Sequence, residues 1–331
     1  MKTIKVLFPL VAIILSSCFN NNPAPSSGIK KPTDTGKEVS EKTVTLNDKQ
    51  VTFRQGMSKE ELLLAVNEFK TPGLGYLFNV NADFEFNLKV GKDVSYSANG
   101  EMRYYLDSVG AKHLSKITKC GNVTHYYGMR ANTSEGESEL YDYSLRGSEL
   151  IYVYGIDVKD DSEYYNENID NSKADEDKNH AHATRCVADY NSFFYDSYET
   201  VTVSSETETL EFTVQVSYKI TEKYLIVETN RPHGIYAKIT GTEMANYMAF
   251  KAASARSDLF YKQTRYYNFE SQLLEYHDIN VKTVTCNYQP LAETSFSAKF
   301  AYVDGGEEAK TKYNEISQYV KENSTKHGII Y

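Results

Sequence analysis

The chain has 331 residues, of which 36 are lysine or arginine and 45 are aspartate or glutamate, so its formal net charge at pH 7 is −9. This acidic balance argues against nucleic-acid binding as a main role and against electrostatic attachment to anionic lipid head groups. The chain also holds 28 Tyr and 15 Phe but no Trp. The tyrosine content has two explanations: the coding bias of an AT-rich genome, or a ligand groove lined with rings that each carry one hydroxyl.

The first 17 residues have the pattern of a signal peptide. Lys2 and Lys5 give a positive start, and residues 6–15 form an apolar stretch that is too short to span a bilayer. The four residues that end this pattern resemble the lipobox of bacterial lipoproteins: Leu15, Ser16, Ser17 and Cys18.

In that family the cysteine thiol receives a diacylglyceryl group, and the peptide bond before it is then cut. The resemblance implies that Cys18 is the lipid-anchored first residue of the mature chain, at the extracytoplasmic face of the cell membrane, and not a nucleophile. Two alternatives are an ordinary secretory signal with an incidental cysteine and an uncleaved membrane anchor.

The segment after the cysteine is polar and rich in Asn, Ser, Pro and Gly. Such a composition buries too little apolar surface to fold, so residues 18–42 are predicted to form a flexible tether. Residues 43–331 then form a β-rich extracytoplasmic domain. It is either a single domain or two lobes divided near an acidic loop at residues 160–185.

Two long segments alternate strictly between apolar and polar residues. In residues 76–90 and 94–106 every second residue is apolar or small, which predicts two strands with one buried and one wet face. The pattern returns in residues 141–145, 150–158, 210–220 and 296–302. Long one-sided strands predict a mainly β (α+β) fold, with a large curved antiparallel sheet or half-barrel and a few amphipathic helices packed on it.

Three segments have the spacing of amphipathic helices. Residues 58–69 begin with a capping box between Ser58 and Glu61, and residues 240–259 and 307–322 follow later. Each apolar stripe is better explained by packing against the sheet than by ligand binding. The stripes of the first and third helices consist of Leu62, Val66 and Phe69, and of Tyr313, Ile316 and Val320.

The order of lipobox, polar tether, helix and long one-sided strands is similar to that of exported lipoproteins of the LolA/LppX type, over residues 58–160. In that superfamily a curved antiparallel sheet forms half a barrel, helices close its mouth, and the concave face binds acyl chains or lipids. No diagnostic motif allows a binding residue to be transferred to this sequence. The resemblance therefore implies a groove for a hydrophobic or lipid-like ligand and nothing more specific.

Three cysteines remain after the lipobox: Cys120, Cys186 and Cys286. In an exported protein one pair can be bridged in any of three ways, whereas widely spaced single cysteines are more often buried small hydrophobes. No disulfide is therefore predicted.

The sequence contains no HExxH, CxxC, GxSxG, P-loop or dinucleotide-binding pattern, so neither catalytic residues nor a cofactor is expected. His180 and His182 are weak metal-ligand candidates, because residues two apart on an extended segment point the same way; two histidines in an acidic polar loop are, however, usually just solvated. The sequence thus predicts a non-catalytic binding protein for a hydrophobic ligand or, alternatively, a cell-envelope scaffold without a pocket.

Overall fold

The structure is a computed structural model, and it describes residues 29–33, 36–70, 78–90, 94–106, 113–132, 137–157, 160–166, 201–204, 209–232, 260–284, 291–304 and 308–328. The helices within these ranges are α1 (Lys59–Val66) and α4 (Glu308–Glu322). The strands are β1 (Glu41–Leu46), β2 (Lys49–Arg54), β3 (Phe78–Val90), β4 (Val94–Leu106), β5 (His113–Cys120), β6 (Val123–Asn132), β7 (Glu137–Arg146), β8 (Glu149–Asp157), β9 (Ser162–Tyr165), β10 (Val201–Ser204), β11 (Thr209–Phe212), β12 (Gln215–Ile220), β13 (Tyr224–Pro232), β14 (Phe260–Asn268), β15 (Leu273–Val284), β16 (Leu291–Asp304) and β17 (Thr325–Gly328).

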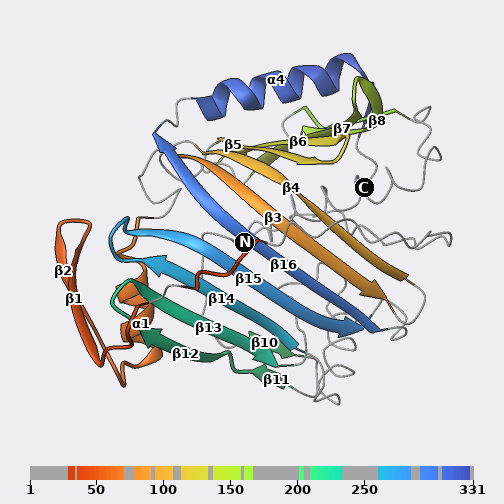
Figure 1. Ribbon diagram of the computed structural model, residues 1–331. Coiled ribbons are helices and arrows are strands. Elements are labelled where there is room, and N and C mark those ends of the chain that lie inside the picture. The colour runs from red at the N-terminus through yellow and green to blue at the C-terminus, as the bar shows by residue number, and fades with distance from the viewer. Residues whose placement is uncertain are drawn as a thin grey trace.

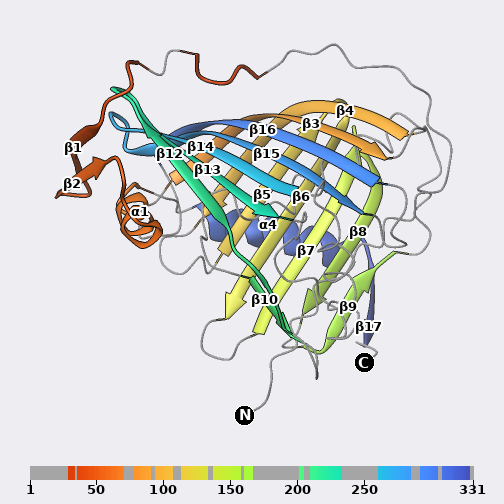
Figure 2. The ribbon, with the colours of Figure 1, turned by 90° about the horizontal axis from the view of Figure 1, so that it is seen from below.

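One large antiparallel sheet dominates the described part of the chain. Its 13 strands follow the order β12-β13-β14-β15-β16-β3-β4-β5-β6-β7-β8-β9-β17, so it is open at β12 and β17 and does not close into a barrel. Figures 1 and 2 show that this sheet is strongly curved. The prediction of a mainly β protein with a large curved antiparallel sheet is confirmed.

The early and late parts of the sequence join in the middle of this sheet. β16 pairs with β3 along almost its whole length, from Ala292 opposite Val90 to Asp304 opposite Phe78. Strands on both sides of the predicted division at residues 160–185 therefore belong to one sheet, and the division into two lobes stays a prediction.

The two predicted long strands are β3 and β4, and they pair from Asn79 opposite Tyr105 to Val90 opposite Val94. Ala82 and Phe84 are buried whereas Asp83 between them is exposed, as the period of two requires.

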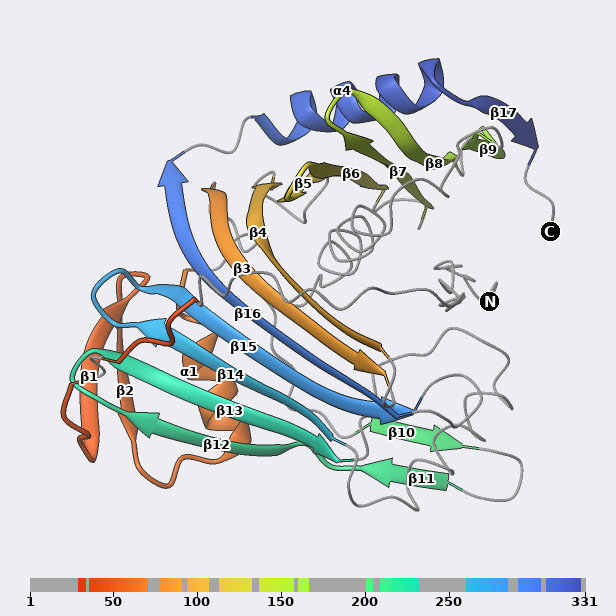
Figure 3. The ribbon, with the colours of Figure 1, turned by 45° about the vertical axis from the view of Figure 1, so that its right-hand side comes forward.

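The two helices lie on opposite faces of the sheet and far from each other (Figure 3). We call the face covered by α1 and the β1–β2 hairpin the α1 face; its core cluster includes Phe84, Met102 and Leu225. We call the other face, on which α4 packs against Tyr141 and Tyr143, the α4 face. Both helices pack against apolar or aromatic side chains of the sheet, as predicted.

Both described helices follow their sequence signals. The side chain of Ser58 accepts a hydrogen bond from the backbone N–H of Glu61, and the Glu61 carboxylate accepts one from the backbone N–H of Ser58, so the predicted capping box is present. The predicted stripes of both helices are buried in the core. The prediction of a helix at residues 240–259 falls outside the described residues.

The prediction of one continuous strand at residues 210–220 is wrong. The chain forms β11, which pairs with β10 in a separate two-stranded sheet, and then β12, which pairs with β13 in the large sheet. Alternation continues through the break, since Val214 between the two strands is fully buried. Period two reports an extended backbone with one buried face, but it does not identify the hydrogen-bonding partner.

The chain is attached to the sheet before residue 42, where the sequence placed the end of the tether. Val39 N donates to Ile220 O at 2.9 Å, and Glu222 N donates to Lys37 O at 3.0 Å. These contacts use backbone groups at the end of edge strand β12, which has no other neighbour on that side among the described strands. Further towards the N-terminus, Ile29 packs on an aromatic cluster of the α4 face that consists of Tyr224, Ile226, Tyr266 and Tyr276.

Candidate functional site

Most of the residues that the sequence singled out lie outside the described part of the chain, namely Cys18, His180, His182, Cys186 and Cys286. Cys120 is described: its thiol is buried in the core of the α1 face and donates a hydrogen bond to Asn99 O at 3.3 Å. The described residues contain no group of three or more His, Cys, Asp or Glu side chains placed to hold a metal ion. Neither described helix is long and apolar enough to cross a membrane.

The α1 face is an apolar surface over most of its width. From β12 to β4 its buried side chains form one cluster with those of α1 and the hairpin. The members contributed by the large sheet in this region include Ile220, Leu225, Val227, Tyr261, Ile279, Val281, Phe296, Ala298, Phe300, Ala82, Phe84 and Met102.

Polar side chains interrupt this surface on the three strands β5, β6 and β7. We call the following residues the polar cluster: Lys116, Thr118, His125, Asp142 and Ser144. Thr118 lies opposite His125, which lies opposite Ser144, and Lys116 and Asp142 flank Tyr127 in the next row. All five residues are less than a tenth exposed.

The strand register explains why these residues share the α1 face. Ser115 points to the α4 face, since its Oγ donates to Ala309 O of the α4 helix at 3.2 Å. Neighbouring residues on a strand point to opposite faces, so Lys116 points to the α1 face. His125 lies directly opposite Thr118, and Ser144 lies directly opposite His125, so both side chains also point to the α1 face.

Lys116 carries a charge into this surface. Its Nζ lies 5.0 Å from the ring centroid of Tyr127 and 5.7 Å from that of Tyr104, and the residue is 1% exposed. The two rings offer their negative faces to the ammonium group. Burial also raises the pKa of Tyr104 well above its ordinary value, so its hydroxyl stays protonated at pH 7.

His125 connects two neighbours on β7. Its Nδ1 lies 2.9 Å from Ser144 Oγ, and its Nε2 lies 3.8 Å from Asp142 Oδ2. Ser, His and Asp are the residue types of a hydrolytic triad, but 3.8 Å is too long for the hydrogen bond that orients the histidine. β7 pairs with strands on both sides, so its backbone N–H groups serve the sheet and are not free to stabilise an oxyanion. The geometry favours binding over acyl transfer.

Thr118 adds a hydroxyl that the fold itself does not use. Its Oγ1 is fully buried and has no hydrogen-bond partner among the described residues. A buried hydroxyl without a partner costs free energy, and a polar group from a ligand or a water molecule would offset that cost.

A second buried polar group lies on the α1 face near the other edge. Gln263 Oε1 accepts a hydrogen bond from Arg265 Nη2 at 2.9 Å and lies 3.0 Å from His277 Nε2. Burial, and next the charge of Arg265, lower the pKa of His277 well below its ordinary value. His277 is therefore neutral at pH 7 and donates from Nε2, since the amide oxygen is an acceptor.

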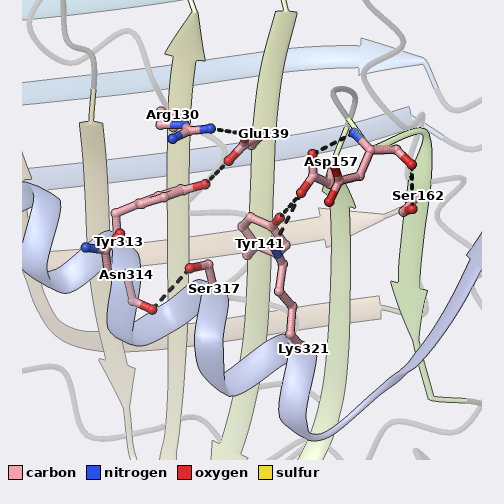
Figure 4. A network of polar contacts seen from close by, with 10 residues as sticks. Arg130, Glu139, Tyr141, Asp157, Ser162, Tyr313, Asn314, Ser317 and Lys321 are labelled. Carbon is pink, nitrogen blue, oxygen red and sulfur yellow. Dashed lines mark hydrogen bonds and ion pairs between the residues drawn. The ribbon is translucent and has the colours of Figure 1, made fainter.

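On the opposite face, a polar network holds α4 against the sheet (Figure 4). Tyr313 donates to the carboxylate of Glu139, which also pairs with Arg130. Lys321 Nζ and Tyr141 Oη both contact Asp157 Oδ2, at 3.3 and 3.0 Å.

The ionised form of Asp157 is stabilised within this network. Burial raises the pKa of its carboxyl, but the backbone N–H of Asp160, the Tyr141 hydroxyl and Lys321 together outweigh burial and hold the pKa below its ordinary value. Every group of the network has a partner, so we assign it the structural task of fixing α4.

The sequence analysis did not identify the polar cluster. One signal was present: Leu114, Lys116, Thr118 and Cys120 alternate with the residues between them, and a lysine stands at a position that the period of two directs inward. His125, Asp142 and Ser144 carried no such signal, because only the pairing of β5, β6 and β7 brings them together.

The chain matches no known protein-family model and no curated protein sequence.

Proposed function

We propose that this chain is a membrane-anchored extracytoplasmic lipoprotein that binds a hydrophobic or lipid-like ligand without catalysis. The lipobox ending at Cys18 supports the anchor. The open, curved sheet is compatible with the half-barrel of the LolA/LppX type, and the ligand is assigned to its α1 face.

One observation carries the ligand proposal. The α1 face joins an apolar surface of many strands to a small polar cluster that holds the buried Lys116 and the Thr118 hydroxyl, and this hydroxyl has no hydrogen-bond partner among the described residues. An amphiphile has the same division, since its chain matches the apolar side chains and its head group matches Lys116 and Thr118. Binding sites of this kind are mostly apolar with a few polar groups that fix orientation.

The ligand is tested by mass spectrometry of organic extracts from the full-length protein purified in detergent. We expect a stoichiometric amphiphile in the wild-type protein and a clear loss in Lys116→Met. Lys119→Met is the matched control, because Lys119 lies on the same strand, is exposed and points to the other face. An empty wild-type protein, or equal loss in both variants, contradicts the proposal.

The anchor is tested separately by labelling cells with a fatty-acid analogue. We expect label on the wild-type chain and none on Cys18→Ala. Unchanged labelling of the variant refutes lipidation at Cys18 but leaves the ligand proposal untouched.

The alternative function is a cell-envelope scaffold with a solid core. The burial of the α1 face favours it, because side chains such as Phe84 and Met102 are already about 1% exposed. An extract free of lipid, together with co-purification of a defined envelope protein, would support this alternative.

A further inference from the structure

A pocket of about 470 Å³ lies where the N-terminal segment meets strands β16, β3 and β4. Ile29 and Lys30 line it from the segment, and Asp83, Glu101 and Lys299 line it from the sheet. The pocket lies beside the point where β5 begins to pair with β4, at Glu101 opposite Lys119. Its volume is within the range of about 300–1,000 Å³ that is usual for small-molecule sites.

Charged side chains of both signs meet at this pocket. Asp83 lies directly opposite Glu101 on one side and directly opposite Lys299 on the other. Side chains directly opposite in an antiparallel pair have Cβ atoms about 4.5–5.5 Å apart, and two like charges in that arrangement destabilise a sheet. The row therefore reads Lys299, Asp83, Glu101, Lys119, with two facing carboxylates in the middle and a lysine opposite each of them on its outer side.

The fold does not neutralise these charges by pairing them. In the described structure, the side chains of Lys30, Asp83, Glu101 and Lys299 form no ion pair and no hydrogen bond. The four groups are exposed to the pocket and available to a bound molecule.

We propose that this pocket binds a small zwitterion of the class of free amino acids and short peptides. Its ammonium group lies between Asp83 and Glu101, and its carboxylate lies at Lys299 and Lys30. A simple anion would meet the two carboxylates, and a simple cation would meet the two lysines, so neither matches the pocket as a zwitterion does. A metal ion is not favoured, because the described residues offer no third ligand of the His, Cys, Asp or Glu type.

This site is independent of the proposed ligand site. Asp83 and Glu101 point away from the α1 face, to which Ala82 and Met102 belong. Ile29 and Lys30, which line the pocket, belong to the segment that the sequence predicts to be the tether.

The first test is isothermal titration calorimetry of the full-length protein in detergent with trialanine. N-acetyl-trialanine lacks the ammonium group and trialanine amide lacks the carboxylate. We expect trialanine to bind with a Kd below about 1 mM and each blocked peptide to bind at least tenfold more weakly. No binding of trialanine, or equal binding of all three peptides, overturns the proposal.

The second test uses variants in the pocket. We expect the double variant Asp83→Asn, Glu101→Gln and the single variant Lys299→Gln each to weaken trialanine binding at least tenfold. Lys89→Gln and Glu293→Gln are matched controls, since both residues are exposed on β3 and β16 and lie outside the pocket. Wild-type affinity in the pocket variants overturns the proposal.

A stability measurement separates binding from folding. The double variant relieves the repulsion between the two carboxylates and also removes their attraction to the facing lysines Lys299 and Lys119, so it should unfold close to the wild-type temperature while binding is lost. A fall in unfolding temperature that accounts for the lost binding would assign the pair a structural role and overturn the proposal. Neither result bears on the amphiphile at the α1 face.

Discussion

Helices α1 and α4 pack on opposite faces of one sheet, and the side chains beneath them differ in kind. Beneath α1 lies a cluster of four aromatic rings from three segments, with centroids of contacting rings 4.9–5.9 Å apart: Phe53, Phe69, Tyr267 and Phe269. Beneath α4 lie mainly tyrosines, whose hydroxyls need partners when they are buried.

That difference decides how each helix is held. Phe69 and its neighbours stabilise the fold because their apolar surface is removed from water. The size of this stabilisation depends on the buried area and on the packing. Tyr141 and Tyr313 bring hydroxyls that bond to Asp157 and Glu139, so the α4 contact depends on ionised carboxylates as well. We therefore expect the packing of α1 to be weakened most by truncating a buried ring, and the packing of α4 to be weakened most by removing an ionised carboxylate.

The largest effect is expected from Phe69→Ala. The ring is almost fully buried and contacts three other rings, so its loss should lower the free energy of unfolding by about 3–5 kcal/mol. Denaturant titration measures the change. Leu64→Ala on helix α1 is the control, because Leu64 is 70% exposed, and it should change stability little. Similar losses in both variants would refute the packing role of the cluster.

The next effect concerns the polar side. Asp157→Ala removes an acceptor shared by Tyr141 and Lys321 and leaves a buried hydroxyl unsatisfied, so stability should fall by about 2–3 kcal/mol. Limited proteolysis should then release α4 before the strands are cut. The exposed pair of Arg146 and Glu149 gives the contrast: Glu149→Ala should cost less than about 1 kcal/mol. Equal losses at both sites would mean that Asp157 has no special role.

The third prediction separates the two faces by pH. The pKa of His277 on the α1 face is lowered, so below pH 6.5 the unfolded chain takes up a proton that the folded chain refuses. Stability should therefore fall with pH below 6.5, with a slope from this group of up to about 1.4 kcal/mol per pH unit. His277→Gln should flatten the slope between pH 6.5 and 5, and an unchanged slope would contradict the assignment.

Asp157 on the α4 side acts in a lower window. Its pKa is also lowered, so its contribution is fully present above the unfolded value of about 4 and is lost as pH falls through the folded value. Release of α4 measured by proteolysis should thus begin only below about pH 4, whereas the His277 effect begins below pH 6.5.

The same comparison shows what the sequence can predict. The capping box of α1 involves residues three apart, and the alternation in β3 and β4 is set by neighbours on one strand. Such local patterns predicted the curved antiparallel sheet, both described helices and their buried faces. They depend only on chain geometry and on which side meets water.

The polar cluster and the pocket follow from register instead. Lys116 and Asp142 become neighbours of Tyr127 because β6 lies between β5 and β7, and Lys299 meets Asp83 because β16 pairs with the distant β3. A shift of one residue in either pairing would place these side chains on different faces. No pattern within one strand carries that information, so the sequence did not predict these sites.

The smallest effect is expected at the start of α1, where a local hydrogen bond adds to apolar packing. Ser58→Ala removes the acceptor for the Glu61 N–H and should lower stability by about 1 kcal/mol. Ser58→Asp should restore most of the loss, since aspartate is an equally good cap, and denaturant titration compares the three proteins. Because Glu61 also pairs with Arg54 of β2 at 2.9 Å, the cap fixes the helix relative to the hairpin. If Ser58→Ala destabilised the protein as much as Phe69→Ala, the α1 contact would depend on polar groups after all, and the contrast between the two faces would fail.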